Sequence, residues 1–185
     1  YQEELVQEMI KKFPQIVSVI LNYNPQKTNV ILGEECVTLW GKDFITDILC
    51  GIRVQISPLA FYQVNKPQAE ALYRQGLAYA ELTGKEILLD LYCGTGTIGL
   101  SATKQVKQLI GVEIIPQAIE NAWENACLNG TSNARFLCGD CKTAVKQLKE
   151  ENLSPDVILI DPPRKGCDQE VLDTISQLSP QKVVM

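Results

Sequence analysis

Short apolar runs alternate with helix-like stretches over the second half of the chain, and this alternation limits the fold more than any other feature. Five apolar runs have the length of buried strands, and four helical patterns lie between them. The strands are expected at 87–91, 109–113, 134–137, 157–160 and 182–185, and the helices at 98–105, 116–128, 142–150 and 168–177. Alternation at this spacing predicts an α/β fold, a Rossmann-like doubly wound parallel sheet with helices on both faces.

The first half follows a different pattern. An amphipathic helix at 5–13 precedes brief β-like runs that Asn-Pro or glycine turn signals separate. The runs are 16–21, 29–32, 37–40, 44–49 and 52–56. They predict a small antiparallel sheet, and Ser57-Pro58 then breaks the chain. We therefore expect a central β-rich subdomain with an N-terminal helix over 1–60 and an α/β domain over 61–185.

Composition excludes several kinds of chemistry. The 185 residues include no histidine, which removes Ser-His-Asp triads, His-paired cysteine nucleophiles and most catalytic zinc sites. Seven cysteines without a secretory signal indicate reduced thiols and a cytoplasmic protein. No apolar run approaches the roughly 18 residues of a membrane span. The net charge of −5 argues mildly against a grip on nucleic-acid phosphates by this segment alone.

A glycine-rich turn follows the first strand of the α/β half and opens a helix. It reads Gly94-Thr95-Gly96-Thr97-Ile98-Gly99, which has the G-x-G-x-x-G spacing of dinucleotide-binding proteins. Gly94 and Gly96 allow a tight turn and a close approach of a ligand to the backbone. An NAD(P)-dependent oxidoreductase is therefore one interpretation of this turn.

Acidic residues near the strand ends favour a different cofactor. Asp90 would repel the pyrophosphate of a dinucleotide, whereas it would attract the sulfonium and ammonium groups of S-adenosyl-L-methionine. Glu113, at the end of the second strand, can accept hydrogen bonds from ribose hydroxyls. Asp140, after the third strand, suits the adenine amino group. Turn capping is the alternative role for Asp90 and Asp140.

A proline turn forms a second part of the expected site. The fourth strand ends in Asp161-Pro162-Pro163-Arg164, where two prolines fix the backbone and direct Asp161 toward the methyl end of the cofactor. Enzymes that methylate amino groups usually have an aromatic residue after such prolines. Arg164 makes an exocyclic amine a less expected target, although a plain Asp-Pro turn is the alternative interpretation.

Three segments together resemble the bacterial RNA uracil-5-methyltransferases, which act on 23S ribosomal RNA or tRNA. They are 57–65, 90–99 and 161–166, and the resemblance extends into 24–25, 28–33 and 39–41. Phe61-Tyr62-Gln63-Val64-Asn65 is the most specific of these motifs. The resemblance implies a class I methyltransferase domain with RNA as its partner. It also implies that Gln63 and Tyr92, like Glu113 and Asp161, contact S-adenosyl-L-methionine.

The resemblance further implies covalent chemistry. In that family a cysteine thiolate adds to uracil C6, which makes C5 nucleophilic, and a carboxylate later removes the C5 proton. None of the seven cysteines matches the family's nucleophile, which is expected beyond Met185, and an RNA-binding barrel is expected before Tyr1. We therefore expect a fragment that binds the cofactor without turnover. Cys138 and Cys141 lack a second pair, so no metal is expected, and a non-catalytic cofactor-binding scaffold remains an alternative.

Overall fold

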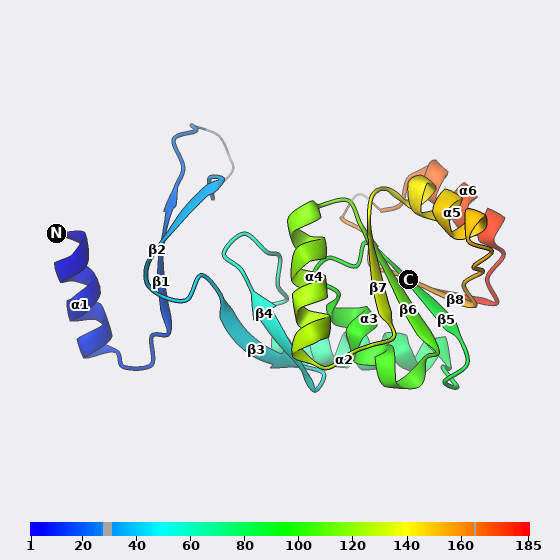
Figure 1. The fold of residues 1–185 in the computed structure, drawn as a ribbon, viewed down its shortest axis with the longest axis horizontal. Coiled ribbons are helices and arrows are strands. Elements are labelled where there is room, and N and C mark those ends of the chain that lie inside the picture. Colours follow the sequence, from blue (N-terminus) through cyan, green and yellow to red (C-terminus); the bar gives the residue numbers. More distant parts are fainter. Residues whose placement is uncertain (28–30, 165) are drawn as a thin grey trace. The chain divides into compact units, whose positions relative to one another are not determined.

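The computed structural model of the protein describes residues 1–27, 31–164 and 166–185 (Figure 1). The chain divides into two compact units, which interleave in sequence. One contains Tyr1–Asp47 and Gln55–Tyr62, and the other contains Ile48–Val54 and Gln63–Met185. The domain division between residues 60 and 61 stays a prediction.

A five-stranded parallel sheet forms the centre of the larger unit, in the order β7-β6-β5-β8-β9. Its strands are β5 (Ile87–Leu91), β6 (Gln108–Glu113), β7 (Ala134–Cys138), β8 (Val157–Ile160) and β9 (Lys182–Val184). The chain builds outward from β5 to β7 and then returns to the other side of β5 with β8. This order confirms the predicted Rossmann-like sheet, and it creates a reversal point between β5 and β8, where such sheets bind ligands.

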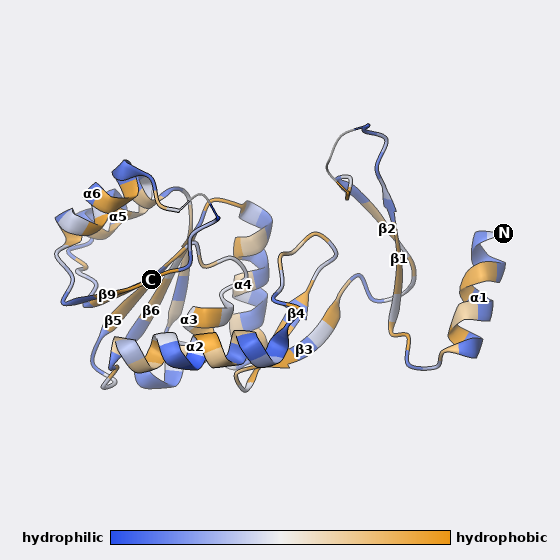
Figure 2. Ribbon diagram, turned by 180° about the vertical axis from the view of Figure 1, so that it is seen from behind, coloured by the Kyte–Doolittle hydropathy of each residue, from blue (hydrophilic) through white to orange (hydrophobic). Residues whose placement is uncertain are grey.

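Helices cover both faces of this sheet (Figure 1). One face packs against α2 (Lys66–Ala80), α3 (Thr97–Ala102) and α4 (Pro116–Leu128), and the other packs against α5 (Cys141–Glu150) and α6 (Gln169–Leu178). A short 3₁₀ helix, η1 (Thr103–Gln105), follows α3. Successive side chains of a strand point to opposite faces of the sheet. Leu88 accordingly packs on the side of α2, α3 and α4, and Leu89 packs on the side of α5 and α6. Blue and orange alternate along α2 in Figure 2, as expected for a helix with one apolar face.

The sequence interpretation does not include α2. Pro67 and Gly76 obscure its helical pattern, although proline is well tolerated in the first turn of a helix, where no intrahelical N–H bond is lost. Its buried residues Ala69, Tyr73 and Ala80 follow the four- and seven-residue spacing of a helix face. That spacing is the signal that could have revealed it.

Two strand pairs and one helix make up the remaining structure. The helix α1 (Gln2–Lys12) precedes an antiparallel pair of β1 (Ser18–Tyr23) and β2 (Glu35–Gly41). A two-residue turn joins β3 (Ile45–Leu49) to β4 (Ile52–Ile56), which form a second pair. Within the described residues the predicted single antiparallel sheet is therefore two separate pairs.

The predicted strand at 29–32 lies partly outside the described residues, and its residues 31 and 32 are not in a strand. Residue 165, within the predicted proline-turn motif, also lies outside them. Along the described parts of the chain, the helices are too short or too polar to cross a bilayer.

Candidate functional site

Four predicted acidic residues lie at the carboxyl ends of four neighbouring strands. Asp90 is the penultimate residue of β5, Glu113 ends β6, Asp140 follows β7 by two residues, and Asp161 follows β8 directly. Parallel strands present their carboxyl ends along one edge of a sheet. The strand order β7-β6-β5-β8 therefore arranges these side chains along that edge as Asp140, Glu113, Asp90 and Asp161, which we call the acidic row.

Asp90 is the most buried acid of this group. It is only 2% exposed, and its Oδ2 accepts a hydrogen bond from the Gly99 backbone N–H at 3.0 Å. Burial, together with the negative charges of Asp161 and Glu113, raises the pKa of Asp90 to about 7, although the hydrogen bond from Gly99 acts to lower it. The bond to Gly99 gives Asp90 the structural role that the sequence left as an alternative. A cation placed nearby would favour its ionised form.

The first two glycines of the turn, Gly94 and Gly96, have different surroundings. Gly94 has a φ of +54°, and a Cβ added there would meet no atom within 4 Å. Gly96 has a φ of +79°, and its added Cβ would lie 3.0 Å from the Phe136 ring and 3.3 Å from Ala122. Gly94 therefore leaves space beside the backbone that a ligand can use, whereas Gly96 is a packing position against β7 and α4.

Glu113 connects the end of β6 to the glycine-rich turn. Its Oε2 accepts from the Gly94 N–H at 3.2 Å, and its Oε1 accepts from the N–H groups of Ile114 and Ile115 at 2.8 and 3.0 Å. A carboxylate offers about four acceptor positions, so three backbone bonds orient it and leave capacity for one more donor. A ligand hydroxyl is a suitable donor.

Asp140 and Asp161 occupy opposite ends of the row. Asp140 is the N-cap of α5, and its Oδ1 accepts from the Thr143 N–H at 2.7 Å, which lowers the pKa of Asp140. The capping role is thus present, and the adenine contact stays a prediction. Asp161 is exposed, yet partial desolvation at the sheet edge raises its pKa.

Tyr92 and Gln63 are half-buried, and their predicted contacts with a cofactor stay predictions. Tyr92 has a left-handed backbone with a φ of +62°. Its side chain packs against the apolar cluster of α5 and α6, beside Cys141 and Cys167, and burial raises its pKa to about 12. Gln63 lies in the segment that leads into α2.

Two buried polar residues that hold the turn are absent from the sequence prediction. Asn125 of α4 is 0% exposed, and its Nδ2 donates to the Thr95 carbonyl at 3.1 Å. Tyr73 of α2 is 4% exposed, and its hydroxyl lies 3.2 Å from the Thr97 hydroxyl. The available signal for Asn125 is its spacing, since it lies between Ala122 and Ala126 on the buried face of α4.

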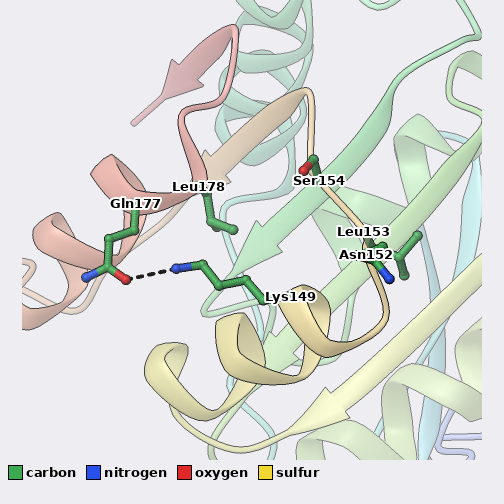
Figure 3. Close-up of a pocket in the computed structure, with 6 residues that line it drawn as sticks. All are labelled: Lys149, Asn152, Leu153, Ser154, Gln177 and Leu178. Carbon is green, nitrogen blue, oxygen red and sulfur yellow. Dashed lines mark hydrogen bonds between the residues drawn. The ribbon is translucent and has the colours of Figure 1, made fainter.

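A separate cavity of about 230 Å³ lies at the other end of the sheet (Figure 3). Its lining comes from the end of α5, the segment before β8 and the end of α6, where Lys149 Nζ donates to Gln177 Oε1 at 3.0 Å. These elements adjoin the amino ends of the strands, so the cavity is no part of the acidic row. Among residues 1–27, 31–164 and 166–185, no cluster of three potential metal ligands is present.

Sequence relatives share almost the whole chain. Residues 82–183 match a family described as "Methyltransferase domain". An "Uncharacterized RNA methyltransferase" of Staphylococcus epidermidis is 47% identical over 182 residues, which are 98% of this chain and 40% of that protein. A protein of the same description from Clostridium tetani is 43% identical over 184 residues, again 40% of its length. The chain thus spans about 40% of the length of these curated relatives.

Solved structures of methyltransferases share the fold of this chain. The tRNA (uracil-54, C5)-methyltransferase of Pyrococcus abyssi, in complex with S-adenosyl-L-homocysteine, is 27% identical with a TM-score of 0.74, covering 94% of this chain and 42% of that one. The tRNA m1G37 methyltransferase of M. jannaschii shares the fold, with 15% identity, a TM-score of 0.57, and 96% of this chain and 50% of that chain covered. The family match and the P. abyssi structure favour the sulfonium cofactor over a dinucleotide. The chain belongs to the methyltransferase-domain family, and its cofactor is S-adenosyl-L-methionine.

Proposed function

We propose that this chain is the cofactor-binding part of an RNA methyltransferase that methylates C5 of a uridine in 23S ribosomal RNA or tRNA. The observation that carries the proposal is the degree of similarity to the P. abyssi tRNA (uracil-54, C5)-methyltransferase. Over 94% of this chain it has 27% identity and a TM-score of 0.74, whereas the M. jannaschii tRNA m1G37 methyltransferase has 15% identity and a TM-score of 0.57. The names of the curated relatives support RNA as the substrate.

The proposed cofactor site follows the acidic row. S-adenosyl-L-methionine supplies an electrophilic methyl group on a cationic sulfur. Asp90 and Asp161 would attract the positive charges of its sulfonium and ammonium groups. Glu113 would accept from a ribose hydroxyl, and Asp140 from the adenine amino group. The open space beside Gly94 suits the close approach of a ligand to the turn.

Gln63 and Tyr92 complete the proposed site, on the strength of the resemblance to uracil-5-methyltransferases. An amide such as that of Gln63 can both donate to and accept from the methionine part of a cofactor. Tyr92 directly follows β5, next to the turn, so its backbone lies at the same sheet edge as Asp90.

The proposed chemistry uses a cysteine thiolate as the nucleophile. The thiolate adds to uracil C6, and the electron pair gained by the ring makes C5 able to accept the methyl group. A carboxylate then removes the C5 proton as the C6–S bond breaks, which regenerates the thiolate. The uridine must be flipped out of its stack to reach this chemistry.

The cysteines of this chain are poor candidates for that nucleophile. Cys93 is 7% exposed, and burial strongly raises its pKa. Cys141 is 8% exposed, and burial raises its pKa to about 11. Both therefore hold few thiolates near neutral pH. None of the seven cysteines matches the nucleophile of the uracil-5-methyltransferases, so none of them is proposed for that role.

RNA that contains 5-fluorouridine tests this chemistry in the whole protein to which this chain belongs. Fluorine at C5 cannot be removed as a proton, so the reaction should stop after methylation with the cysteine still bonded to C6. We expect a protein–RNA complex that survives denaturing electrophoresis and depends on S-adenosyl-L-methionine. The matched control is the same RNA with uridine, which should turn over without accumulating the complex.

The methylated nucleoside provides the second readout. Mass spectrometry of digested uridine RNA should find 5-methyluridine. A methyl group on guanosine or adenosine, or turnover of 5-fluorouridine RNA without a covalent complex, would contradict the proposal.

A further inference from the structure

The helix α2 lies outside the generic methyltransferase segment at 82–183, yet one of its side chains reaches the glycine-rich turn. Tyr73 is 4% exposed, and its Oη lies 3.2 Å from Thr97 Oγ1. Thr97 directly follows Gly96 and is the first residue of α3. The two hydroxyls therefore connect α2 to the end of the glycine-rich turn, where α3 begins.

Packing alone does not explain why residue 73 carries a hydroxyl group. Burial of a phenol hydroxyl is unfavourable unless it forms a hydrogen bond, and phenylalanine would fill nearly the same volume without that cost. The bond with Thr97 uses one of the two hydroxyl protons. Among the described residues neither hydroxyl has another hydrogen-bond partner, so one of the two O–H groups is available to donate to a ligand.

The surroundings of Tyr73 identify the part of the site that it adjoins. The helix α2 packs against β8, which Asp161 directly follows. Burial raises the pKa of Tyr73, and the negative charges of Asp161 and Asp90 act in the same direction. These acids belong to β8 and β5, at the reversal point of the sheet. Asp140, the proposed adenine partner, lies at the β7 end of the row. Tyr73 is thus on the side where the cofactor's amino-acid part is proposed to bind.

We propose that Tyr73 is a positioning residue for the methionine part of the cofactor. It acts through Thr97, whose hydroxyl it orients and whose place at the end of the turn it fixes. The neutral hydroxyl pair offers its spare proton toward the α-carboxylate of the methionine part. This inference rests on the proposed cofactor site and adds to it a residue from outside the generic domain.

Two ligands separate this role from a general effect on the turn. S-adenosyl-L-methionine contains the amino-acid part, and 5′-methylthioadenosine lacks it. In the Tyr73→Phe variant of this chain, calorimetry should find S-adenosyl-L-methionine bound roughly three- to tenfold more weakly, the scale of one hydrogen bond. The affinity for 5′-methylthioadenosine should not change. Tyr79→Phe is the matched control, since Tyr79 lies on the same helix and is 63% exposed.

A double-mutant cycle then tests whether Tyr73 acts through Thr97. If it does, Thr97→Val should weaken the binding of S-adenosyl-L-methionine, and the double variant with Tyr73→Phe should bind nearly as well as Thr97→Val alone. Additive losses, equal losses for both ligands, or an unchanged affinity in Tyr73→Phe would overturn the inference. If the unsubstituted chain binds neither ligand, the proposed cofactor site itself fails, which is a distinguishable result.

Discussion

Replacement of Asp90 by asparagine is expected to stabilise the cofactor-free chain and to weaken its binding of S-adenosyl-L-methionine. The two effects have one cause. Asp90 is buried, and keeping its charge in that environment is unfavourable without a cation nearby. Asparagine retains an oxygen that can accept from the Gly99 N–H, so the turn keeps its hydrogen bond.

The pH dependence of this gain has a definite sign. Burial raises the pKa of Asp90 from its ordinary 3.8 to about 7, so the folded chain binds this proton more tightly than the unfolded chain does. The contribution of the group to the free energy of unfolding is therefore complete below about pH 4 and is lost as the pH rises to about 7. At pH 8 the lost stability is about 4 kcal/mol, and Asp90→Asn should recover much of it.

Urea unfolding of both forms at pH 5 and pH 8 measures this effect. The difference in free energy of unfolding between Asp90→Asn and the unsubstituted chain should be larger at pH 8. Without the carboxylate charge, S-adenosyl-L-methionine should bind roughly ten- to a hundredfold more weakly. Asp173→Asn, at an exposed position of α6, is the control for the chemical change alone. A destabilised Asp90→Asn variant, or one with undiminished affinity, would contradict this account of Asp90.

Alanine at Gly96 is expected to lower mainly the stability of the chain, whereas alanine at Gly94 is expected to lower mainly its affinity for the cofactor. Both positions have left-handed backbones, which cost alanine about 1–2 kcal/mol. At Gly96 the new methyl group would also press on Phe136 and Ala122, so the free energy of unfolding should fall by about 2–4 kcal/mol in total. At Gly94 the methyl group has open space, so only the backbone cost applies.

The affinity for S-adenosyl-L-methionine should show the reverse order, with the larger loss in Gly94→Ala. The methyl group of Gly94→Ala would occupy the space through which the cofactor approaches, and the affinity should fall by about tenfold or more, at least about 1.4 kcal/mol. Denaturant unfolding and calorimetry on the same preparations would measure both quantities. If Gly94→Ala binds S-adenosyl-L-methionine normally, the cofactor does not approach the turn at Gly94.

The sheet of the larger unit could be predicted because the sequence patterns that indicate it each lie within a short stretch of the chain. Each strand is a short apolar run, each helix between strands has its own period, and alternation of the two allows essentially one architecture. The acidic row follows from the same reasoning, since residues at the ends of parallel strands must meet at one edge. Asp90, Glu113, Asp140 and Asp161 are found there.

Other features depend on contacts between distant residues, which no local pattern reveals. Tyr73 and Thr97 are 24 residues apart, and Asn125 and Thr95 are 30 apart. Tyr92 has a left-handed backbone and packs against the apolar cluster of α5 and α6, and neither feature can be read from its local sequence. The separation of the predicted antiparallel sheet into two pairs likewise depends on strand pairing between segments.

Titration of this chain with S-adenosyl-L-methionine and, separately, with NAD tests the central claim most directly. We expect saturable binding of one S-adenosyl-L-methionine per chain and none of NAD. Glu113→Ala and Asp161→Ala should each weaken that binding by about 1–3 kcal/mol, the scale of a hydrogen bond to a charged group. Binding of NAD without S-adenosyl-L-methionine, or unchanged affinity in both variants, would contradict a cofactor site at the acidic row.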